Sequence, residues 1–235
     1  MKPKYLGKQN SFSRSCSLDR ISRKESRKDF NKFESYGLDI WNAYEFSYLL
    51  NGKPKTAVLE ISIPSKSEYT IESKSMKLFL NSFFNKNYSK QSEVINILKK
   101  RISKKCNSEV KILTKNSFET FNRDNFINKS GLLVYKSFRS ICPVTSQPDW
   151  GNIYIYSSTD SLNKKEISNF LYSLRNHGGF HENCVEKIFL YIKITFSIDH
   201  LEVCGRFFRR GGIDINPIRS SQKKLFFANF REFNQ

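Results

Sequence analysis

The 235-residue sequence lacks the signatures of the common nucleotide and metal sites. Its ten glycines nowhere spell Gly-x-Gly-x-x-Gly or the phosphate-binding P-loop, so a Rossmann or P-loop nucleotide site is not expected. No His-Glu-x-x-His pair occurs, because Val185 stands where a second histidine would follow His181 and Glu182. No apolar run approaches the length of a membrane span, and the opening ten residues contain no apolar signal core. We therefore expect a soluble protein without a membrane partner.

Cysteine is scarce and scattered. The five cysteines are odd in number and form no Cys-x-x-Cys pair, which is typical of a reducing cytoplasm and argues against a disulfide framework. One metal set is conceivable, with His177, His181 and Cys184 at i, i+4 and i+7 and Cys142 as a fourth ligand. Glycines at 178 and 179 would break a helix between the histidines, so we expect no metal.

Acidic residues are few relative to basic ones, and the formal net charge is +18. Such a charge is compatible with nucleic-acid binding. The lysines are spread over the whole chain, however, and Lys, Asn, Ile, Phe and Ser are abundant together, a pattern that A/T-rich codons would produce. The aromatic residues stand mostly at core-like spacing rather than within a basic stripe. We therefore expect no direct nucleic-acid partner, although a cationic pocket for a phosphorylated cofactor remains compatible with the composition.

Strand and helix patterns occur in the same order twice. Residues 1–35 are rich in Ser, Lys and Arg and are expected to form a mobile or wrapping arm, with regular structure beginning near Tyr36. Each half then predicts two strands, two amphipathic helices and a further strand. The predicted strands are 44–50, 56–63, 110–113, 132–141, 152–156 and 201–208, and the helices are centred on 76–83, 94–102, 167–174 and 185–192. A duplicated α+β unit with antiparallel sheets follows, with the boundary between Asn116 and Gly131 and modules at 36–125 and 126–235.

Four segments carry residues suited to chemistry. The segment from Cys142 to Gly151 sets a thiol and the Asp149 carboxyl seven residues apart in a loop stiffened by two prolines, Pro143 and Pro148. The others are 71–79, which opens the first helix with Ser73 or Ser75 as its cap, 180–184 at the start of a later helix, and the Arg- and Gly-rich stretch 206–217, expected to be a basic turn after a strand. Taken singly, each also has an ordinary structural explanation.

Together the four segments resemble the NADPH-dependent 7-cyano-7-deazaguanine reductases, the nitrile-reducing enzymes of queuosine biosynthesis. The resemblance covers about residues 36–220, carried by Glu72-Ser73-Lys74-Ser75, the 142–149 loop, His181-Glu182 and the 206–217 stretch. It is closest to the longer, two-module branch of that family. The resemblance implies tandem tunnelling-fold modules, with antiparallel sheets and paired helices, and active sites at module interfaces. It also implies a cytoplasmic enzyme, which we expect to be a homodimer.

The resemblance further implies a role for each site residue. Cys142 would be the nucleophile that forms a thioimide with the nitrile, Asp149 the proton donor and His181 an assistant. Two NADPH would be consumed per nitrile, without a metal. The implied binding residues are Ile71, Glu72, Ser73, His181 and Glu182 for the deazaguanine base, and Ser73, Lys74, Arg210 and Gly211 for NADPH. Two alternatives stay open, a metal-dependent cyclohydrolase of the same fold and a basic nucleic-acid-binding protein.

Overall fold

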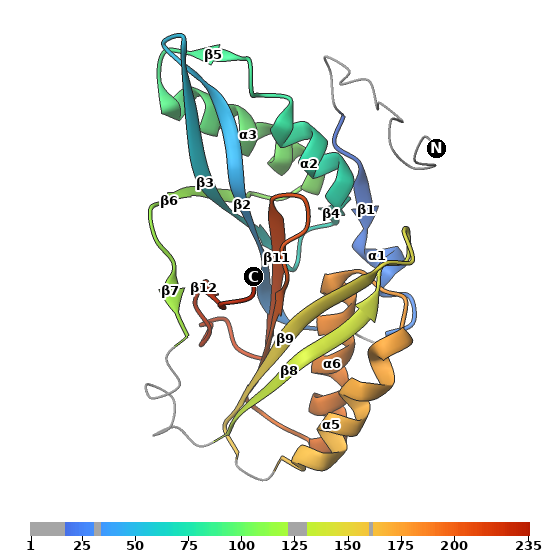
Figure 1. The fold of residues 1–235 in the computed structure, drawn as a ribbon. Coiled ribbons are helices and arrows are strands. Elements are labelled where there is room, and N and C mark those ends of the chain that lie inside the picture. The colour runs from blue at the N-terminus through green and yellow to red at the C-terminus, as the bar shows by residue number, and fades with distance from the viewer. Residues whose placement is uncertain (1–16, 31–33, 122–130, 160–161) are drawn as a thin grey trace, which may run out of the picture.

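A central sheet joins the two halves of the chain. The computed structural model describes residues 17–30, 34–121, 131–159 and 162–235. The sheet runs in the order β6-β3-β2-β11-β10-β9-β8, and every neighbouring pair on this path is antiparallel (Figure 1). Its strands are β2 (Tyr36–Leu50), β3 (Lys53–Pro64), β6 (Lys111–Lys115), β8 (Leu132–Ile141), β9 (Pro148–Ser157), β10 (Leu201–Phe207) and β11 (Ile213–Ser220). The join is the pairing of β2 with β11.

Shorter strands lie around this sheet. The strand β1 (Arg20–Ser22) pairs with β4 (Tyr69–Ile71), and β5 (Asn87–Tyr88) runs parallel to the end of β2. The strand β7 (Glu119–Thr120) runs parallel to β12 (Phe230–Arg231). The helices are α1 (Arg23–Ser26), α2 (Ser73–Asn81), α3 (Gln91–Cys106), α5 (Lys164–Ser173) and α6 (His181–Phe196), with a 3-10 turn at Leu174–Asn176. This architecture confirms the α+β class.

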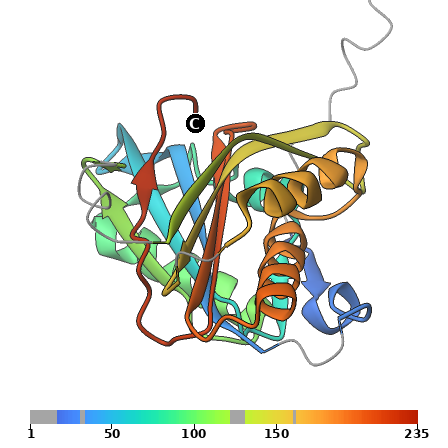
Figure 2. The ribbon, with the colours of Figure 1, turned by 90° about the horizontal axis from the view of Figure 1, so that it is seen from below.

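Alternation along the strands creates two kinds of buried surface. In β2, Trp41 and Ala43 pack with α2 and α3 in one core, while Ile40 belongs to the opposite face, which the C-terminal segment covers (Figure 2). Helices α5 and α6 form a separate core with β8, β9 and β10. In both halves, the helices therefore cover one face of the sheet.

Local sequence explains several element ends. Asn51 and Gly52 both have positive φ, as the expected hairpin between β2 and β3 requires. Helices α3 and α6 end at Asn107 and Ser197 in the left-handed conformation.

In the described part of the chain, no helix is long and apolar enough to cross a membrane.

Three sequence predictions were wrong in their local detail. The stretch 206–217 is not only a turn, because its second part forms the fully buried strand β11 in the middle of the sheet. Pro217 stands within this strand opposite Asp39, which is unusual for a central position. The loop starting at Cys142 is also shorter than expected. Pro148 already pairs with Ile141, so Asp149 lies on β9 and the loop is confined to 142–147.

The third error concerns the N-terminal arm, whose regular structure begins before Tyr36. Residues 17–30 form β1 and α1, and Leu18 and Arg23 are buried. The arm prediction for residues 1–16 and 31–33 lies outside the described residues. The division into modules 36–125 and 126–235 stays a prediction, and 122–130 at its boundary is likewise outside them.

Candidate active site

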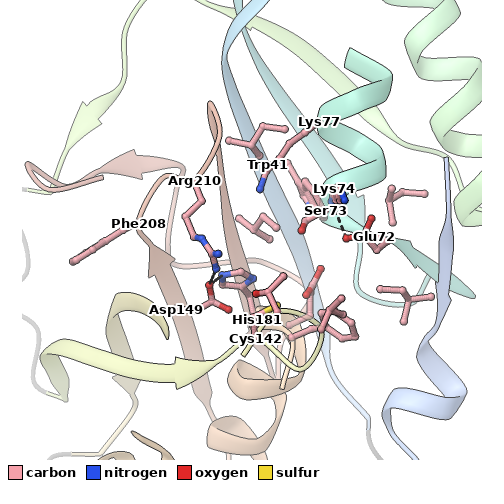
Figure 3. A pocket seen from close by; sticks show the side chains of 18 residues that line it. Trp41, Glu72, Ser73, Lys74, Lys77, Cys142, Asp149, His181, Phe208 and Arg210 are labelled. Atoms are coloured by element: carbon pink, nitrogen blue, oxygen red, sulfur yellow. Dashed lines mark hydrogen bonds and ion pairs between the residues drawn. The ribbon is translucent and has the colours of Figure 1, made fainter. Parts of the chain in front are cut away.

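A cavity of about 220 Å³ lies where α2, the start of α6 and the β8–β9 hairpin approach one another (Figure 3). Nine of the ten residues assigned from the sequence line it, and both halves of the chain contribute. These nine are Ile71, Glu72, Ser73, Lys74, Cys142, Asp149, His181, Glu182 and Arg210. The tenth, Gly211, lines a neighbouring cavity that shares Lys77 with the first.

Cys142 stands at the beginning of the β8–β9 loop, which backbone hydrogen bonds hold closed. The Cys142 N–H donates to the Gln147 carbonyl at 2.9 Å, and Ser146 N–H donates to the Cys142 carbonyl at 3.0 Å. The preceding residue, Ile141, exchanges backbone hydrogen bonds with His177 and Gly179, just before α6. The hairpin is therefore tied to the chain just before the helix that carries His181, and Cys142 and His181 line the same cavity.

Asp149 is buried next to two basic side chains. Arg210, in the turn between β10 and β11, donates to its Oδ1 atom and also to the Gln147 side chain. The His181 Nε2 atom lies 3.8 Å from the same Asp149 oxygen (Figure 3). Burial lowers the pKa of His181 to about 4, although the nearby Asp149 carboxylate opposes this change. The imidazole is therefore neutral near pH 7 and can relay a proton.

Glu182 presents a buried carboxyl at the second position of α6. It is 6% exposed and accepts a hydrogen bond from the Thr70 hydroxyl at 3.2 Å. Burial, and then the nearby Asp39 carboxylate, raise its pKa to about 7, against the opposing effect of Arg23 and Arg219. A group with this pKa can accept or release a proton as a ligand with hydrogen-bond donors enters.

Glu72 is the N-cap of α2, rather than Ser73 or Ser75 as the sequence suggested. Its carboxylate accepts from the Lys74 and Ser75 backbone N–H groups at 2.8 and 2.7 Å. The Ser75 hydroxyl instead donates to the Glu72 carbonyl. The same carboxylate faces the cavity, so capping and ligand contact compete for its oxygens.

Cationic side chains gather at the α2 side of the cavity. Lys74 and Arg210 were assigned from the sequence, and Lys77 follows Lys74 along α2. Burial lowers the pKa of Lys77, and the Arg210 guanidinium lowers it further. Like charges held this close favour an anionic ligand, and a phosphorylated cofactor fits this set of donors. Gly211, with φ of +59°, leaves room beside the Lys77 side chain.

Several lining residues were missed from the sequence. The aromatic residues Trp41, Phe180 and Phe208 and the aliphatic Ile213 and Ile215 line the cavity together with the assigned polar groups. Their patterns are those of strand or core residues, and nothing in the sequence separates them from other such positions. The signal for Lys77 was present, because it lies on the same helix start as Ser73 and Lys74.

The alternative metal set is not assembled among the described residues, where no three His, Cys, Asp or Glu side chains are grouped to hold an ion. His177 ends the 3-10 turn before α6, and His181 faces Asp149 instead. The Cys184 thiol contacts the Gly179 carbonyl at 3.7 Å. The geometry therefore gives no support to a cyclohydrolase-like site.

The cavity combines a thiol, a buried acid, a neutral imidazole and a cationic rim formed by Lys74, Lys77 and Arg210. Comparison with known proteins shows to which class of protein a chain with this cavity belongs. Residues 9–114 match the family model "Nitrile reductase, 7-cyano-7-deazaguanine-reductase N-term", and residues 148–225 match the model "QueF-like protein". The chain is thus an oxidoreductase of the nitrile reductase class.

Curated relatives make the family specific. An NADPH-dependent 7-cyano-7-deazaguanine reductase from Coxiella burnetii is 36% identical over 248 residues, covering 92% of this chain and 89% of the relative. Reductases of the same name from Desulfotalea psychrophila and Burkholderia orbicola are 35% and 34% identical, covering 96% and 85% of this chain and 95% and 84% of their own. The chain belongs to the NADPH-dependent 7-cyano-7-deazaguanine reductase family.

Proposed function

We propose that this protein reduces the nitrile of 7-cyano-7-deazaguanine to an aminomethyl group with NADPH, in queuosine biosynthesis. The observation that carries the proposal is the convergence of Cys142, Asp149 and His181 with two carboxylates in one cavity, in a chain of this family. Residues from both halves line that cavity, so neither half is expected to work alone. The product is destined for tRNA, but the substrate is the free base.

The thiol of Cys142 attacks the nitrile carbon, because a nitrile is a weak hydride acceptor and a thioimide is a better one. The thiol proton passes to the Asp149 carboxylate, and Asp149 gives it to the nitrile nitrogen as the carbon–sulfur bond forms. After the first reduction the carbon–sulfur bond breaks, and the sulfur leaves as thiolate to give an imine. The second reduction then gives the amine. His181, neutral and 3.8 Å from Asp149, assists by relaying the thiol proton to that carboxylate, accepting at one ring nitrogen and donating from the other.

The base is held by carboxylates. Its 2-amino and ring N–H groups form a donor edge that Glu182 accepts as the main anchor, with Glu72 as the second. Ile71, Ser73 and His181 complete this side of the cavity. Because Glu182 has a pKa of about 7, binding of a donor edge favours its ionised form.

NADPH supplies the hydride, once for each of two reductions, when it is bound in this cavity. Ser73, Lys74, Arg210 and Gly211 are the residues proposed to hold it. The cationic rim described above suits its additional phosphate, since arginine forms forked hydrogen bonds to phosphate oxygens. No metal is required for this chemistry.

The repeated order of strands and helices supports the two-module branch of the family, with tunnelling-fold modules at 36–125 and 126–235. A homodimer in the cytoplasm is the form in which we expect it to act. Sedimentation of the purified chain would test the dimer.

The decisive experiment measures NADPH oxidation by absorbance with 7-cyano-7-deazaguanine, comparing the native chain with Cys142→Ala. We expect two NADPH consumed per nitrile by the native chain and none by the variant, which should still bind the base. Cys204→Ala is a matched control, because that thiol is buried in the hydrophobic cluster under the C-terminal segment and does not line the cavity. A native chain that binds the base and oxidises no NADPH would overturn the proposal.

A further inference from the structure

The N-terminal segment Ser17–Phe30 contacts both elements that present carboxylates to the cavity. On the α2 side, the Asp19 backbone carbonyl accepts from the Glu72 N–H at 2.9 Å, and the Asp19 N–H donates to the Ser75 hydroxyl at 3.0 Å. On the α6 side, the Asn183 side chain donates to the Ser26 carbonyl at 2.7 Å. The segment therefore braces Glu72 and Glu182 from one continuous piece of chain, and Ile21 of the same segment lines the cavity.

Within this segment, Arg23 is almost fully buried, with 4% exposure. Its Nη2 atom donates to Asp39 at 2.5 Å, and its Nε atom donates to the Ser67 hydroxyl at 3.0 Å. Asp39 accepts a second hydrogen bond from Arg219 at 2.7 Å, so each of its oxygens is held by a different guanidinium. A buried arginine needs such partners, because an unpaired charge in this position would be strongly unfavourable.

The cluster continues to α6. Glu186, one turn after Glu182, accepts from Arg219 at 2.7 Å and from Arg27 at 2.6 Å. The guanidiniums of Arg23, Arg27 and Arg219 thus surround two carboxylates, Asp39 and Glu186. Glu182 is the buried carboxyl on the preceding turn of the same helix, so its ionised form adds a third negative charge near these three cations.

We propose that Arg23 is a positioning residue for the base site, and that its buried positive charge favours the Glu182 carboxylate that accepts the donor edge of the base. This inference rests on the proposed function for the identity of the ligand, but the coupling between Arg23 and Glu182 is a property of the protein alone. It gives the N-terminal segment a role in recognition rather than only in packing.

The groups that face Glu182 decide the direction of the effect. They are Asp39 from β2, Arg23 from α1, Arg219 from β11, the Thr70 hydroxyl from β4, and His181, the Cys184 thiol and Glu186 on its own helix. Removing Arg23 takes away a cation and leaves the Asp39 charge less compensated. Both changes favour protonated Glu182, which cannot accept two donors from the base.

The test measures equilibrium binding of 7-cyano-7-deazaguanine between pH 5.5 and 8.5, in the Cys142→Ala background so that binding is non-covalent. We expect Arg23→Gln to move the midpoint of binding upward by about one pH unit, which is about fivefold weaker binding at pH 7 and about tenfold weaker at pH 6 or below. The affinity should recover at high pH, and Arg23→Lys should stay near the native midpoint. Lys24→Gln, an exposed neighbour on α1, is the control that removes the same charge without effect.

A second pair of variants separates the charge effect of Arg23→Gln from any effect on folding. Arg23→Gln leaves buried Asp39 short of a partner, so we compare Asp39→Asn with Arg23→Gln/Asp39→Asn, in which that carboxylate is absent. The pH midpoint of base binding should be higher in the double variant than in Asp39→Asn. Equal midpoints in both comparisons, or an affinity lowered equally at every pH, would overturn the role of Arg23.

A ligand-free readout separates this inference from the proposed function. The Glu182 carboxyl carbon, assigned with Glu182→Gln, is titrated by NMR, and its midpoint should rise in Arg23→Gln. If the base does not bind the native chain but this midpoint rises, the proposed function fails and the charge coupling stands. If the base binds and the midpoint is unchanged, only the further inference fails.

Discussion

Arg210 and Asp149 form an ion pair at the cavity, although 61 positions separate them in the sequence. Arg210 lies in the turn after β10 and is partly exposed, while Asp149 is buried at the start of β9. The pair thus joins a proposed cofactor-binding cation to the proposed proton donor. An anionic group entering the cavity would compete with Asp149 for the same guanidinium.

Replacing Arg210 should weaken binding of the phosphorylated cofactor selectively. A hydrogen bond to a charged group contributes about 1.5–3 kcal/mol, so Arg210→Gln should lower NADP⁺ affinity roughly tenfold or more. NAD⁺ affinity should change little, because that dinucleotide lacks the additional phosphate. Fluorescence titration of both dinucleotides measures the ratio. The control is Arg209→Gln, whose guanidinium pairs at 3.2 Å with the exposed Glu45 instead. An unchanged ratio in Arg210→Gln would contradict the assignment.

His181 and Glu182 should give stability opposite dependences on pH. The folded-state pKa of His181 is lowered to about 4 from 6.5, so its contribution to stability is lost as pH falls below 6.5. The folded-state pKa of Glu182 is raised to about 7 from 4.5, so its contribution is lost as pH rises from 4.5 through 7. Between pH 7 and 5, each changes the free energy of unfolding by about 2 kcal/mol, with opposite signs.

Because the two contributions cancel in the native chain, single variants should reveal the pH dependence of each in the free energy of unfolding. Relative to the native chain, His181→Gln should gain stability as pH falls from 7 to 5, and Glu182→Gln should lose it. Urea unfolding at several pH values measures both effects. The pH dependence of stability in the double variant should resemble that of the native chain. Parallel curves for the two single variants would show that the two titrations do not offset each other.

The residues proposed to take part in the reaction could be located from the sequence because they occur in short local segments. Cys142 and Asp149, or His181 and Glu182, are close in sequence, and their spacing carried the resemblance. The strand β11 was missed because Asp214, Asn216 and Pro217 disfavour a central strand when judged locally. The Asp214 and Asn216 side chains can be buried in a central strand only because distant residues hydrogen-bond to them, as the Asn42 side-chain amide does to Asp214.

The N-terminal segment was underestimated for a related reason. Its many charges indicate a solvated arm, since isolated arginines rarely enter a core. Arg23 and Arg27 are buried or half-buried only because Asp39 and Glu186 lie opposite them in the folded chain. Such pairing across 16 and 159 positions leaves no local pattern to recognise.

Glu72 should prove to have two separable roles. Glu72→Ala removes the cap of α2 and should cost about 1 kcal/mol of stability, together with base affinity. Glu72→Gln keeps one acceptor oxygen and should retain more stability, but it loses the charge that attracts the donor edge. Thermal unfolding and base titration measure the two effects. Asn163→Ala removes the side-chain cap of α5 and should cost similar stability with unchanged base affinity. Equal base affinity in all three variants would remove Glu72 from the binding site.

Gly211 and Gly52 provide a matched pair for testing the cofactor side of the cavity. Both have positive φ, +59° and +76°, so alanine at either position should cost about 1 kcal/mol through backbone strain. They differ in what an added Cβ would meet, because nothing lies within 4 Å at Gly52, whereas the Lys77 Cδ atom lies 3.3 Å away at Gly211.

Gly211→Ala should therefore displace the Lys77 side chain and lower NADP⁺ affinity several-fold, while Gly52→Ala should leave it unchanged at the same loss of stability. Dinucleotide titration and thermal unfolding of both variants separate contact from strain. If the two variants lose NADP⁺ affinity equally, strain alone accounts for the change. Gly211 would then have no local part in holding the cofactor, and that role would be left to Ser73, Lys74 and Arg210.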